Sequence, residues 1–243
     1  MIVLIITAVR VKSMDSHRIS GRILAENIAG PGMMRLVEQS MQARAQKTSV
    51  TEIAVKEWKH PQAALTFDDG PDIRYTPLLL DGLKERNVRA SFFLLGEKVE
   101  QYPELVERMQ KEGHLVGNHT YHHVQLNKLN ETKAREEILK TNNLIYETTG
   151  VYPLYLRPPF GAWKKNLELC VEMLPVFWTI DTLDWKVQNT EKIVRTVQEQ
   201  IEDGAIILMH DEYDTSVEAA LKVVDELKNQ GYELVKVDQL ILP

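Results

Sequence analysis

From about residue 60 onward, short apolar runs alternate with longer segments in which apolar positions recur every three or four residues. The short runs predict β-strands at 63–67, 90–94, 114–117, 154–157, 176–180, 205–209 and 233–237. The longer segments predict helices at about 76–86, 102–112, 131–148, 190–202 and 214–230. Regular alternation of strand and helix favours a parallel sheet with right-handed crossovers. We therefore predict an α/β fold: a distorted (β/α) barrel with a mostly parallel sheet, either closed or incomplete.

Residues 1–59 do not continue this alternation, and we expect them to form an N-terminal extension to a main domain of residues 60–243. Residues 18–47 predict a linker of two short helices, broken at Gly30-Pro31-Gly32. The apolar run 2–6 is too short to span a bilayer, and no positive residue precedes it. It is either the remnant of a signal anchor, which would attach the protein to a membrane, or a buried strand. The sequence leaves both interpretations open.

Composition and charge narrow the function classes. The chain has 243 residues, 44% of them hydrophobic, which is enough for the core of one barrel-sized domain. Residues 1–61 carry 9 Lys/Arg against 5 Asp/Glu, and the remainder carries 20 against 30. An acidic main domain without a basic stretch repels phosphate backbones, so we expect no nucleic-acid partner. Cys170 is the only cysteine, which excludes an intrachain disulfide and every cysteine-based zinc site.

Two adjacent carboxylates follow the first predicted strand. Asp68 and Asp69 come directly after the run 63–67, and Gly70-Pro71 ends the segment. Both side chains are therefore expected at the carboxyl edge of the sheet, where barrel active sites lie. Neighbouring carboxylates repel each other unless a cation or a proton intervenes, which favours a metal for one and general-base duty for the other. An ordinary Asx-type turn is the alternative interpretation.

Three of the seven histidines lie between positions 119 and 123. His119 and His123 are four residues apart, so a helical turn would place both imidazoles on one face. Two imidazole nitrogens and one carboxylate oxygen, with positions left for water, form a known catalytic site for zinc and related divalent ions. A solvated surface loop is the alternative.

Further polar residues follow later predicted strands, at the same expected edge. Arg157 precedes the rigid segment Pro158-Pro159-Phe160-Gly161. Its guanidinium could orient a carboxylate through paired hydrogen bonds, or simply cap the strand. Asp181 and Asp184 follow the next strand, and His210 ends the one after it. A single histidine after a buried strand is more often structural than catalytic, so His210 alone does not indicate chemistry.

Taken in order, these segments resemble the five motifs of the polysaccharide deacetylases, which are carbohydrate esterase family four or the nodulation-deacetylase homology domain. The five segments are Thr66-Phe67-Asp68-Asp69-Gly70-Pro71, His119-Thr120-x-x-His123, Arg157-x-Pro159-x-Gly161, Asp181-x-x-Asp184-Trp185 and Leu208-x-His210. The resemblance covers roughly residues 60–243 and says nothing about 1–59. Thr120 stands where the family usually has serine, and Phe160 where tyrosine is frequent.

The resemblance implies a metal centre. Its ligands would be Asp69, His119 and His123, holding one divalent ion. We expect zinc, with Co²⁺, Ni²⁺ and Mn²⁺ as alternatives.

The resemblance also implies acid–base and substrate-binding roles. Asp68 would be the general base and Arg157 would orient it, while His210 would be the general acid, held and charged by Asp184. Three further residues would contact the acetyl group, through the Phe160 backbone N–H at the oxyanion and the side chains of Trp185 and Leu208 around the methyl.

By resemblance, the expected function is removal of N-acetyl groups from N-acetylglucosamine in a cell-wall polysaccharide. Peptidoglycan is our choice of substrate because the resemblance is strongest to bacterial cell-wall deacetylases; chitin oligomers and acetylxylan are alternatives. Such an enzyme would act outside the cytoplasm, secreted or membrane-anchored at the bacterial cell surface, and as a monomer. Two rival functions are hydrolysis of cyclic imides or ureides and non-catalytic sugar binding. The intact Asp184-Trp185 pair argues against the first, and the complete set of motif residues against the second.

Overall fold

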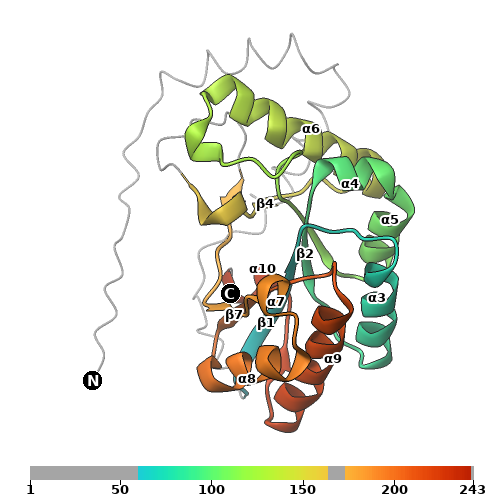
Figure 1. Cartoon of the computed structure of the whole chain (residues 1–243). Helices are drawn as coiled ribbons and strands as arrows, with labels where there is room; N and C mark the ends of the chain where they lie inside the picture. Colours follow the sequence, from blue (N-terminus) through green and yellow to red (C-terminus); the bar gives the residue numbers. More distant parts are fainter. Residues whose placement is uncertain (1–59, 164–172, 242–243) are drawn as a thin grey trace, which may run out of the picture. The chain divides into compact units, whose positions relative to one another are not determined.

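The computed structural model describes residues 60–163 and 173–241, where parallel strands form one sheet with helices around it (Figure 1). The strands are β1 (Gln62–Asp68), β2 (Ser91–Leu94), β3 (Leu115–Asn118), β4 (Tyr155–Leu156), β5 (Leu174–Pro175), β6 (Ile180–Asp181), β7 (Ala205–His210) and β8 (Glu233–Leu234). Their order is β5-β4-β3-β2-β1-β7-β6, and β8 pairs with the start of β1. Since the curled sheet ends at β5 and β6, it is half of a barrel. The prediction of a distorted, incomplete (β/α) barrel is confirmed.

Apart from α10, which follows the last strand, the helices lie between consecutive strands, as crossover connections of a parallel sheet require. They are α3 (Tyr75–Glu85), α4 (Gly96–Gln101), α5 (Pro103–Lys111), α6 (Glu131–Thr149), α7 (Asp184–Val187), α8 (Thr190–Gln200), α9 (Asp214–Asn229) and α10 (Val237–Ile241), with two 3-10 turns, η1 (Leu126–Lys128) and η2 (Pro159–Gly161). In the outer layer, α8, α9, α3, α5 and α6 contact one another in series. Side chains of Asn130 and Asn189 cap the N-termini of α6 and α8.

Alternation along β1 separates the core from the site. Leu65 and Phe67 are buried in the main hydrophobic cluster, between the sheet and the outer helices. Ala64 belongs to a different cluster, and Thr66 and Asp68 share its face because strand side chains alternate. In the register of the sheet, Asp68 stands opposite His210 of β7. The strand thus supplies the core from one face and the chemistry from the other.

The predicted strand at 176–180 is wrong as a single element. Its position is taken by β5, which pairs with β4 at one edge of the sheet, and β6, which pairs with β7 at the other. The residues between them cross from one edge of the half-barrel to the other, and Phe177 there is 42% exposed. An apolar run can therefore span an opening between strands as well as form one.

Several other boundaries differ from the prediction. The strand expected at 233–237 ends at Leu234, and α10 begins at Val237. Helices α4, α7 and α10 were not predicted because each spans six residues or fewer, too short for a clear periodic pattern. The expected extension 1–59, with its run 2–6 and linker helices 18–47, lies outside the described residues. Within the described part of the chain, no helix is both long and apolar enough to span a bilayer.

Candidate active site

Asp68 and Asp69 lie at the carboxyl end of β1 and point to different partners. Asp68 is the last residue of the strand and only 3% exposed. Asp69 has φ of 70°, in the left-handed region that non-glycine residues rarely adopt. This turn of the backbone directs two consecutive carboxylates into one site instead of onto opposite faces of the strand.

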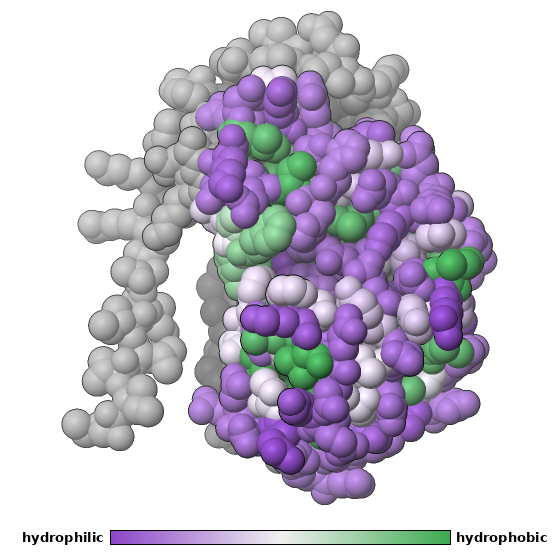
Figure 2. Space-filling model, viewed as in Figure 1, coloured by the Kyte–Doolittle hydropathy of each residue, from purple (hydrophilic) through white to green (hydrophobic). Residues whose placement is uncertain are grey.

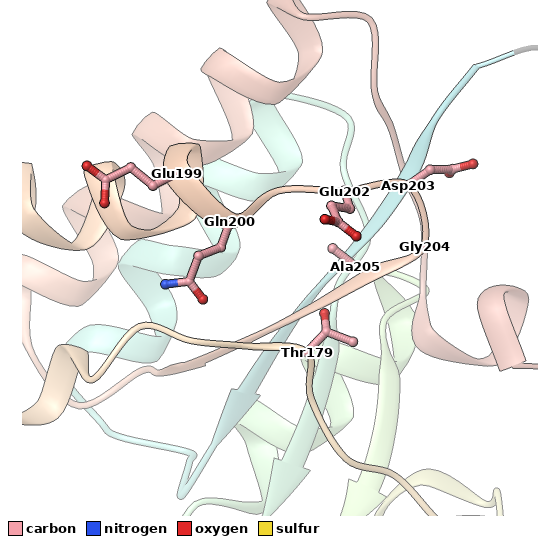
Figure 3. A pocket seen from close by; sticks show the side chains of 7 residues that line it. All are labelled: Thr179, Glu199, Gln200, Glu202, Asp203, Gly204 and Ala205. Atoms are coloured by element: carbon pink, nitrogen blue, oxygen red, sulfur yellow. The ribbon is translucent and has the colours of Figure 1, made fainter. Parts of the chain in front are cut away.

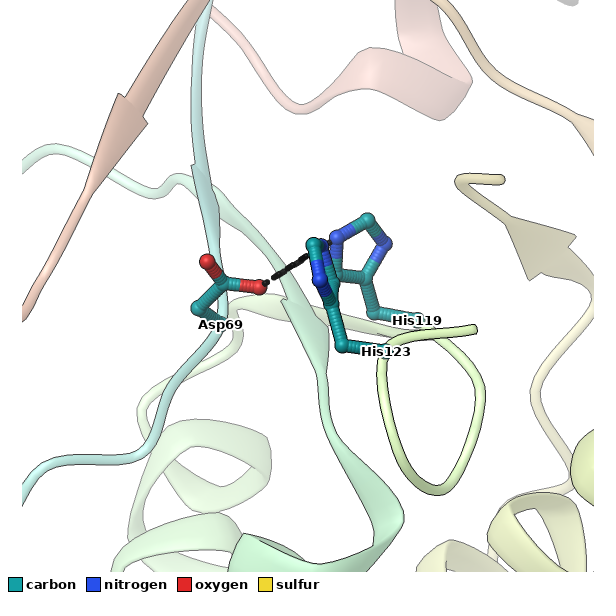
Figure 4. Close-up of side chains that lie close together, drawn as sticks. All are labelled: Asp69, His119 and His123. Carbon is teal, nitrogen blue, oxygen red and sulfur yellow. Dashed lines mark ion pairs between the residues drawn. The ribbon is translucent and has the colours of Figure 1, made fainter. Parts of the chain in front are cut away.

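A loop carries His119 and His123 from the end of β3, and the expectation of a helical turn is wrong. His119 follows directly on the strand and is 2% exposed. Thr120 and His123 have φ of 68° and 55°, values that no α-helix contains. The tight loop nevertheless brings both rings to the same side, with their centroids 5.0 Å apart (Figure 4).

Asp69, His119 and His123 form the one cluster in the described residues whose ligand atoms could hold a metal ion. Oδ1 of Asp69 lies 3.4 Å from Nε2 of His119 and 3.4 Å from Nε2 of His123 (Figure 4). Ligands about 2.0–2.1 Å from a tetrahedral zinc ion are separated by roughly 3.4 Å. This Oδ1 is buried and has no hydrogen-bond partner. An oxygen without a partner between two imidazole nitrogens fits a divalent cation.

Hydrogen bonding orients His119 for this role. Its Nδ1 lies 2.6 Å from the carbonyl oxygen of Arg157, which can only accept, so Nδ1 carries the proton. Nε2 is thereby left with a lone pair facing Asp69. Burial lowers the pKa of His123, which also favours the neutral imidazole that a cation needs.

Arg157 and Asp68 form a buried ion pair beside the cluster. Nη1 of Arg157 donates to Oδ1 of Asp68 at 2.8 Å and to Oγ1 of Thr66 at 2.7 Å. The guanidinium is fully buried and stacks on the Phe93 ring, 4.2 Å from its centroid. The expectation that Arg157 forms paired hydrogen bonds with one carboxylate is wrong. A single guanidinium nitrogen, Nη1, donates to both Asp68 and Thr66. Oδ2 of Asp68 faces the cluster, 3.7 Å from Nε2 of His119.

His210 and Asp184 form a second pair across the site. Nδ1 of His210 and Oδ1 of Asp184 are 2.8 Å apart, and Oδ2 accepts the His210 backbone N–H at 2.8 Å. Nε2 of His210 faces Asp69, 3.8 Å from Oδ2. Burial opposes a charged imidazole, but the hydrogen bond and charge of Asp184 outweigh it and raise the pKa of His210 to about 9. At neutral pH the Nε2 of His210 therefore carries a proton.

The three residues expected around the acetyl group differ in exposure. Phe160 is 62% exposed, has φ of 60°, and its ring centroid lies 4.5 Å from that of His123. Trp185 is 49% exposed in α7, and Leu208 of β7 is buried. Figure 2 shows a hydrophobic area over α7 on a face that is otherwise mainly hydrophilic. None of the described contacts places a substrate among these three residues, so their roles stay predictions.

A separate cavity lies at the opposite end of β7. It has a volume of about 420 Å³ and is lined by Thr179, Glu199, Gln200, Glu202, Asp203, Gly204 and Ala205 (Figure 3). Gly204 and Ala205 begin β7, whereas His210 ends it, so this cavity is not part of the cluster around Asp69. The side chains that line it offer acidic and amide groups.

Two residues that support the site could not be identified from the sequence. The motif assigns Thr66 no role of its own, yet its hydroxyl bridges Arg157 and the Ile207 carbonyl. Glu137 of α6 accepts the backbone N–H groups of Tyr121 and His122, and no local pattern singles it out. Their roles become visible only in the folded structure, because each contacts a segment that is distant in the sequence.

The comparisons with known proteins agree with this geometry. The family profile described as polysaccharide deacetylase matches residues 56–177. A peptidoglycan-N-acetylglucosamine deacetylase of Bacillus cereus is 40% identical over 186 residues, which cover 74% of this chain and 68% of that protein. Another from Listeria monocytogenes is 43% identical over 177 residues, covering 73% of this chain but 38% of that protein. The chain thus matches well under half of the Listeria protein's length.

A solved structure shares the fold. Peptidoglycan deacetylase PdaC from Bacillus subtilis superposes with a TM-score of 0.73 at 42% identity, covering 75% of this chain and 91% of that one. By sequence, the same relative is described as a peptidoglycan-N-acetylmuramic acid deacetylase and is 43% identical over 177 residues, 73% of this chain and 38% of that protein.

Proposed function

The chain belongs to the polysaccharide deacetylase family, and from this premise we propose that it is a metal-dependent hydrolase that removes N-acetyl groups from a cell-wall polysaccharide. The observation that carries the proposal is the unpartnered Oδ1 of Asp69, equidistant from two imidazole nitrogens. Beside it stand one carboxylate fixed by a cation, Asp68, and one imidazole charged by a carboxylate, His210.

In the proposed mechanism, this chain's residues move two protons. Asp68 accepts a proton from the attacking water at Oδ2, since Arg157 occupies Oδ1. A divalent ion held by Asp69, His119 and His123 would polarise the amide carbonyl and acidify the water. The water oxygen bonds to the acyl carbon, and the backbone N–H of Phe160 is proposed to donate to the resulting oxyanion.

The second proton transfer breaks the amide. An amine leaves poorly unless it is protonated, and Nε2 of His210 would supply that proton as the C–N bond breaks. Asp184 keeps His210 in its charged form until then. The products are acetate and a free amino sugar. Trp185 and Leu208 would enclose the acetyl methyl and exclude bulk water from it.

We propose peptidoglycan N-acetylglucosamine as the substrate. The relatives include deacetylases described for N-acetylglucosamine and for N-acetylmuramic acid, each 43% identical. Overall sequence similarity therefore does not distinguish between the two sugars. Action on this polymer would place the enzyme outside the cytoplasm, at the bacterial cell surface. Membrane attachment through residues 1–12 and a monomeric state belong to the same proposal.

The test is acetate release after metal removal and restoration. Metal-free protein is reloaded with Zn²⁺, Co²⁺, Ni²⁺ or Mn²⁺ in turn and offered peptidoglycan, chitin oligomers or acetylxylan. We expect Zn²⁺ to restore release from peptidoglycan, and tandem mass spectrometry of the enzymatically digested product to show the loss of acetyl on glucosamine and not on muramic acid. No acetate from any polymer with any ion would contradict the proposal.

We also propose that residues 60–243 are the catalytic domain. All the residues assigned above lie within them, so a protein lacking residues 1–59 is expected to deacetylate a small soluble oligosaccharide at a rate close to that of the full chain. The comparison uses kcat, with circular dichroism as the control for folding. An unfolded product would mean that the extension contributes to the barrel core.

A further inference from the structure

The loop between the proposed metal ligands His119 and His123 has an unfavourable backbone. Thr120 and His123 both have positive φ, and neither is a glycine. Such residues persist only where surrounding contacts determine the conformation. Contacts outside the loop must therefore hold the two imidazoles 5.0 Å apart.

Part of this support comes from the start of the loop. The side-chain oxygen of Asn118 accepts the Thr120 N–H at 2.7 Å. Its side-chain nitrogen donates to the Ile138 carbonyl and to Asn142 of α6. The carbonyl of Thr120 accepts the N–H of Gly96 at 2.9 Å. These bonds fix the first residues after β3 but leave the segment before His123 to other partners.

Glu137 of α6 supplies further support, beside the hydrogen bonds from Glu97 N–H to the Tyr121 carbonyl and from Val124 N–H to the Thr120 hydroxyl. Its Oε2 accepts the N–H groups of Tyr121 and His122, at 3.0 and 2.9 Å. Its Oε1 lies 2.7 Å from Nδ1 of His122. The carboxylate side chain is 16% exposed, so burial strengthens these bonds relative to bonds in water. All three contacts are made to the two residues immediately before His123.

Side chains of two helices hold Tyr121 in place. Its hydroxyl donates to Glu100 of α4, and the ammonium of Lys140 lies 3.4 Å from the ring centroid. Gly96 is required here, since a Cβ on it would approach Tyr121 Cδ2 to 2.5 Å. The loop is consequently held between α4 and α6, with Glu137 as its main-chain acceptor.

We propose that Glu137 is a positioning residue for the metal centre: its carboxylate fixes Tyr121 and His122 so that His123 meets His119 and Asp69 at ligand distance. This inference rests on the metal centre in the proposed function. Residues that orient metal ligands typically change metal affinity by about 10- to 100-fold when they are replaced.

The test measures Zn²⁺ affinity in purified, metal-free protein by competition with a chelating dye. Glu137→Met has a similar shape and helix propensity but no acceptor, and it is expected to weaken Zn²⁺ binding by about 10- to 100-fold. Glu137→Gln retains one oxygen for both N–H groups and is expected to stay within about threefold of wild type. Glu136→Gln is the matched control, because Glu136 is its exposed neighbour on α6.

A second readout follows the loop itself. Hydrogen exchange at the Tyr121 and His122 amides of the metal-free protein should accelerate in Glu137→Met and stay unchanged in the Glu136 control. Wild-type affinity in Glu137→Met would overturn the proposal. Equal weakening in the Met and Gln variants would also overturn it, since lost charge and not lost anchoring would then be the cause.

Two further outcomes are distinguishable. Should Glu137→Met fail to fold without metal, Glu137→Asp replaces it, because the shorter side chain keeps the charge but loses the reach; weaker Zn²⁺ binding supports the proposal and wild-type affinity overturns it. If the wild-type protein binds no Zn²⁺, or Asp69→Asn binds it equally well, the proposed metal centre itself is wrong. Normal wild-type binding with unaffected Glu137 variants refutes only the positioning role.

Discussion

Asp184 holds His210 through both of its carboxylate oxygens, one at the imidazole Nδ1 and one at the backbone N–H, each at 2.8 Å. The side chain of Asp184 is fully buried, and that of His210 is 12% exposed. This geometry fixes the ring with Nε2 toward Asp69, one of the proposed metal ligands. It also raises the pKa of His210 to about 9, against the opposing effect of burial.

The contact between Asp184 and His210 lets us predict how activity depends on pH. A general acid with a raised pKa stays protonated until the pH passes that value, so the alkaline limb of kcat in the wild-type enzyme should lie above the ordinary pKa of histidine. Asp184→Asn removes the charge that stabilises the imidazolium. We expect the limb to move to lower pH by on the order of one unit, and peak kcat to fall by up to about 100-fold. Rates on a soluble oligosaccharide between pH 5 and 10 measure both.

If the limb stays in place in folded Asp184→Asn, the titration belongs to a different group. Interacting groups report apparent values for the whole site, so a shift is assigned to His210 only when His210→Gln abolishes the limb as well.

The sequence predicted the main architecture because its elements repeat a simple pattern. Strands β1, β2, β3 and β7 are buried apolar runs, and their observed ends fall within about one residue of the expected ones. Polar residues at the carboxyl ends of parallel strands were therefore expected to meet at one edge of the sheet. Asp68 and His210, expected from separate strands, do stand opposite each other in the register.

The sequence could not predict features that depend on distant partners. The backbone at Asp69, Thr120 and His123 has positive φ, which no local composition indicated, since none is a glycine. The expected helical turn through His119 and His123 assumed that spacing alone sets the geometry. In the structure, hydrogen bonds from another helix and the neighbouring strand hold the loop.

Replacing each of the two adjacent aspartates by asparagine, one at a time, should distinguish their roles. Asp69→Asn removes the charge of a proposed ligand and is expected to abolish Zn²⁺ binding, because two neutral imidazoles hold the ion poorly. Asp68→Asn is expected to retain the metal and lose turnover, since an amide cannot accept the proton of water. Metal content by mass spectrometry and acetate release are measured on the same samples. Loss of metal in Asp68→Asn with retention in Asp69→Asn would mean that the two assignments are reversed.

Removing Arg157 should destabilise the protein strongly. Its guanidinium is fully buried, and the Asp68 side chain is only 5% exposed, so Arg157→Met leaves a buried carboxylate without its cation. Breaking a buried pair from one side costs about 3–5 kcal/mol of unfolding free energy. The double variant with Asp68→Asn removes both charges and should lose less than the two single changes added together. Urea unfolding of the four proteins measures this coupling, and strict additivity would contradict it.

Asp211 should make stability fall as pH rises, because its carboxyl is buried behind Gly70 and accepts a hydrogen bond from Thr76. Burial raises its pKa from 3.8 to about 7. The folded state therefore binds this proton more tightly than the unfolded state, so the contribution is complete below about pH 4 and is lost as pH rises to about 7. Asp211→Asn stays neutral and should escape this loss. In metal-free protein, we expect the Tm of Asp211→Asn minus that of wild type to be at least about 3 °C larger at pH 8 than at pH 5. The same charge change at exposed Glu136→Gln should produce no such gain, and an equal pH dependence in all three proteins would show that Asp211 is ionised in the folded state throughout this range.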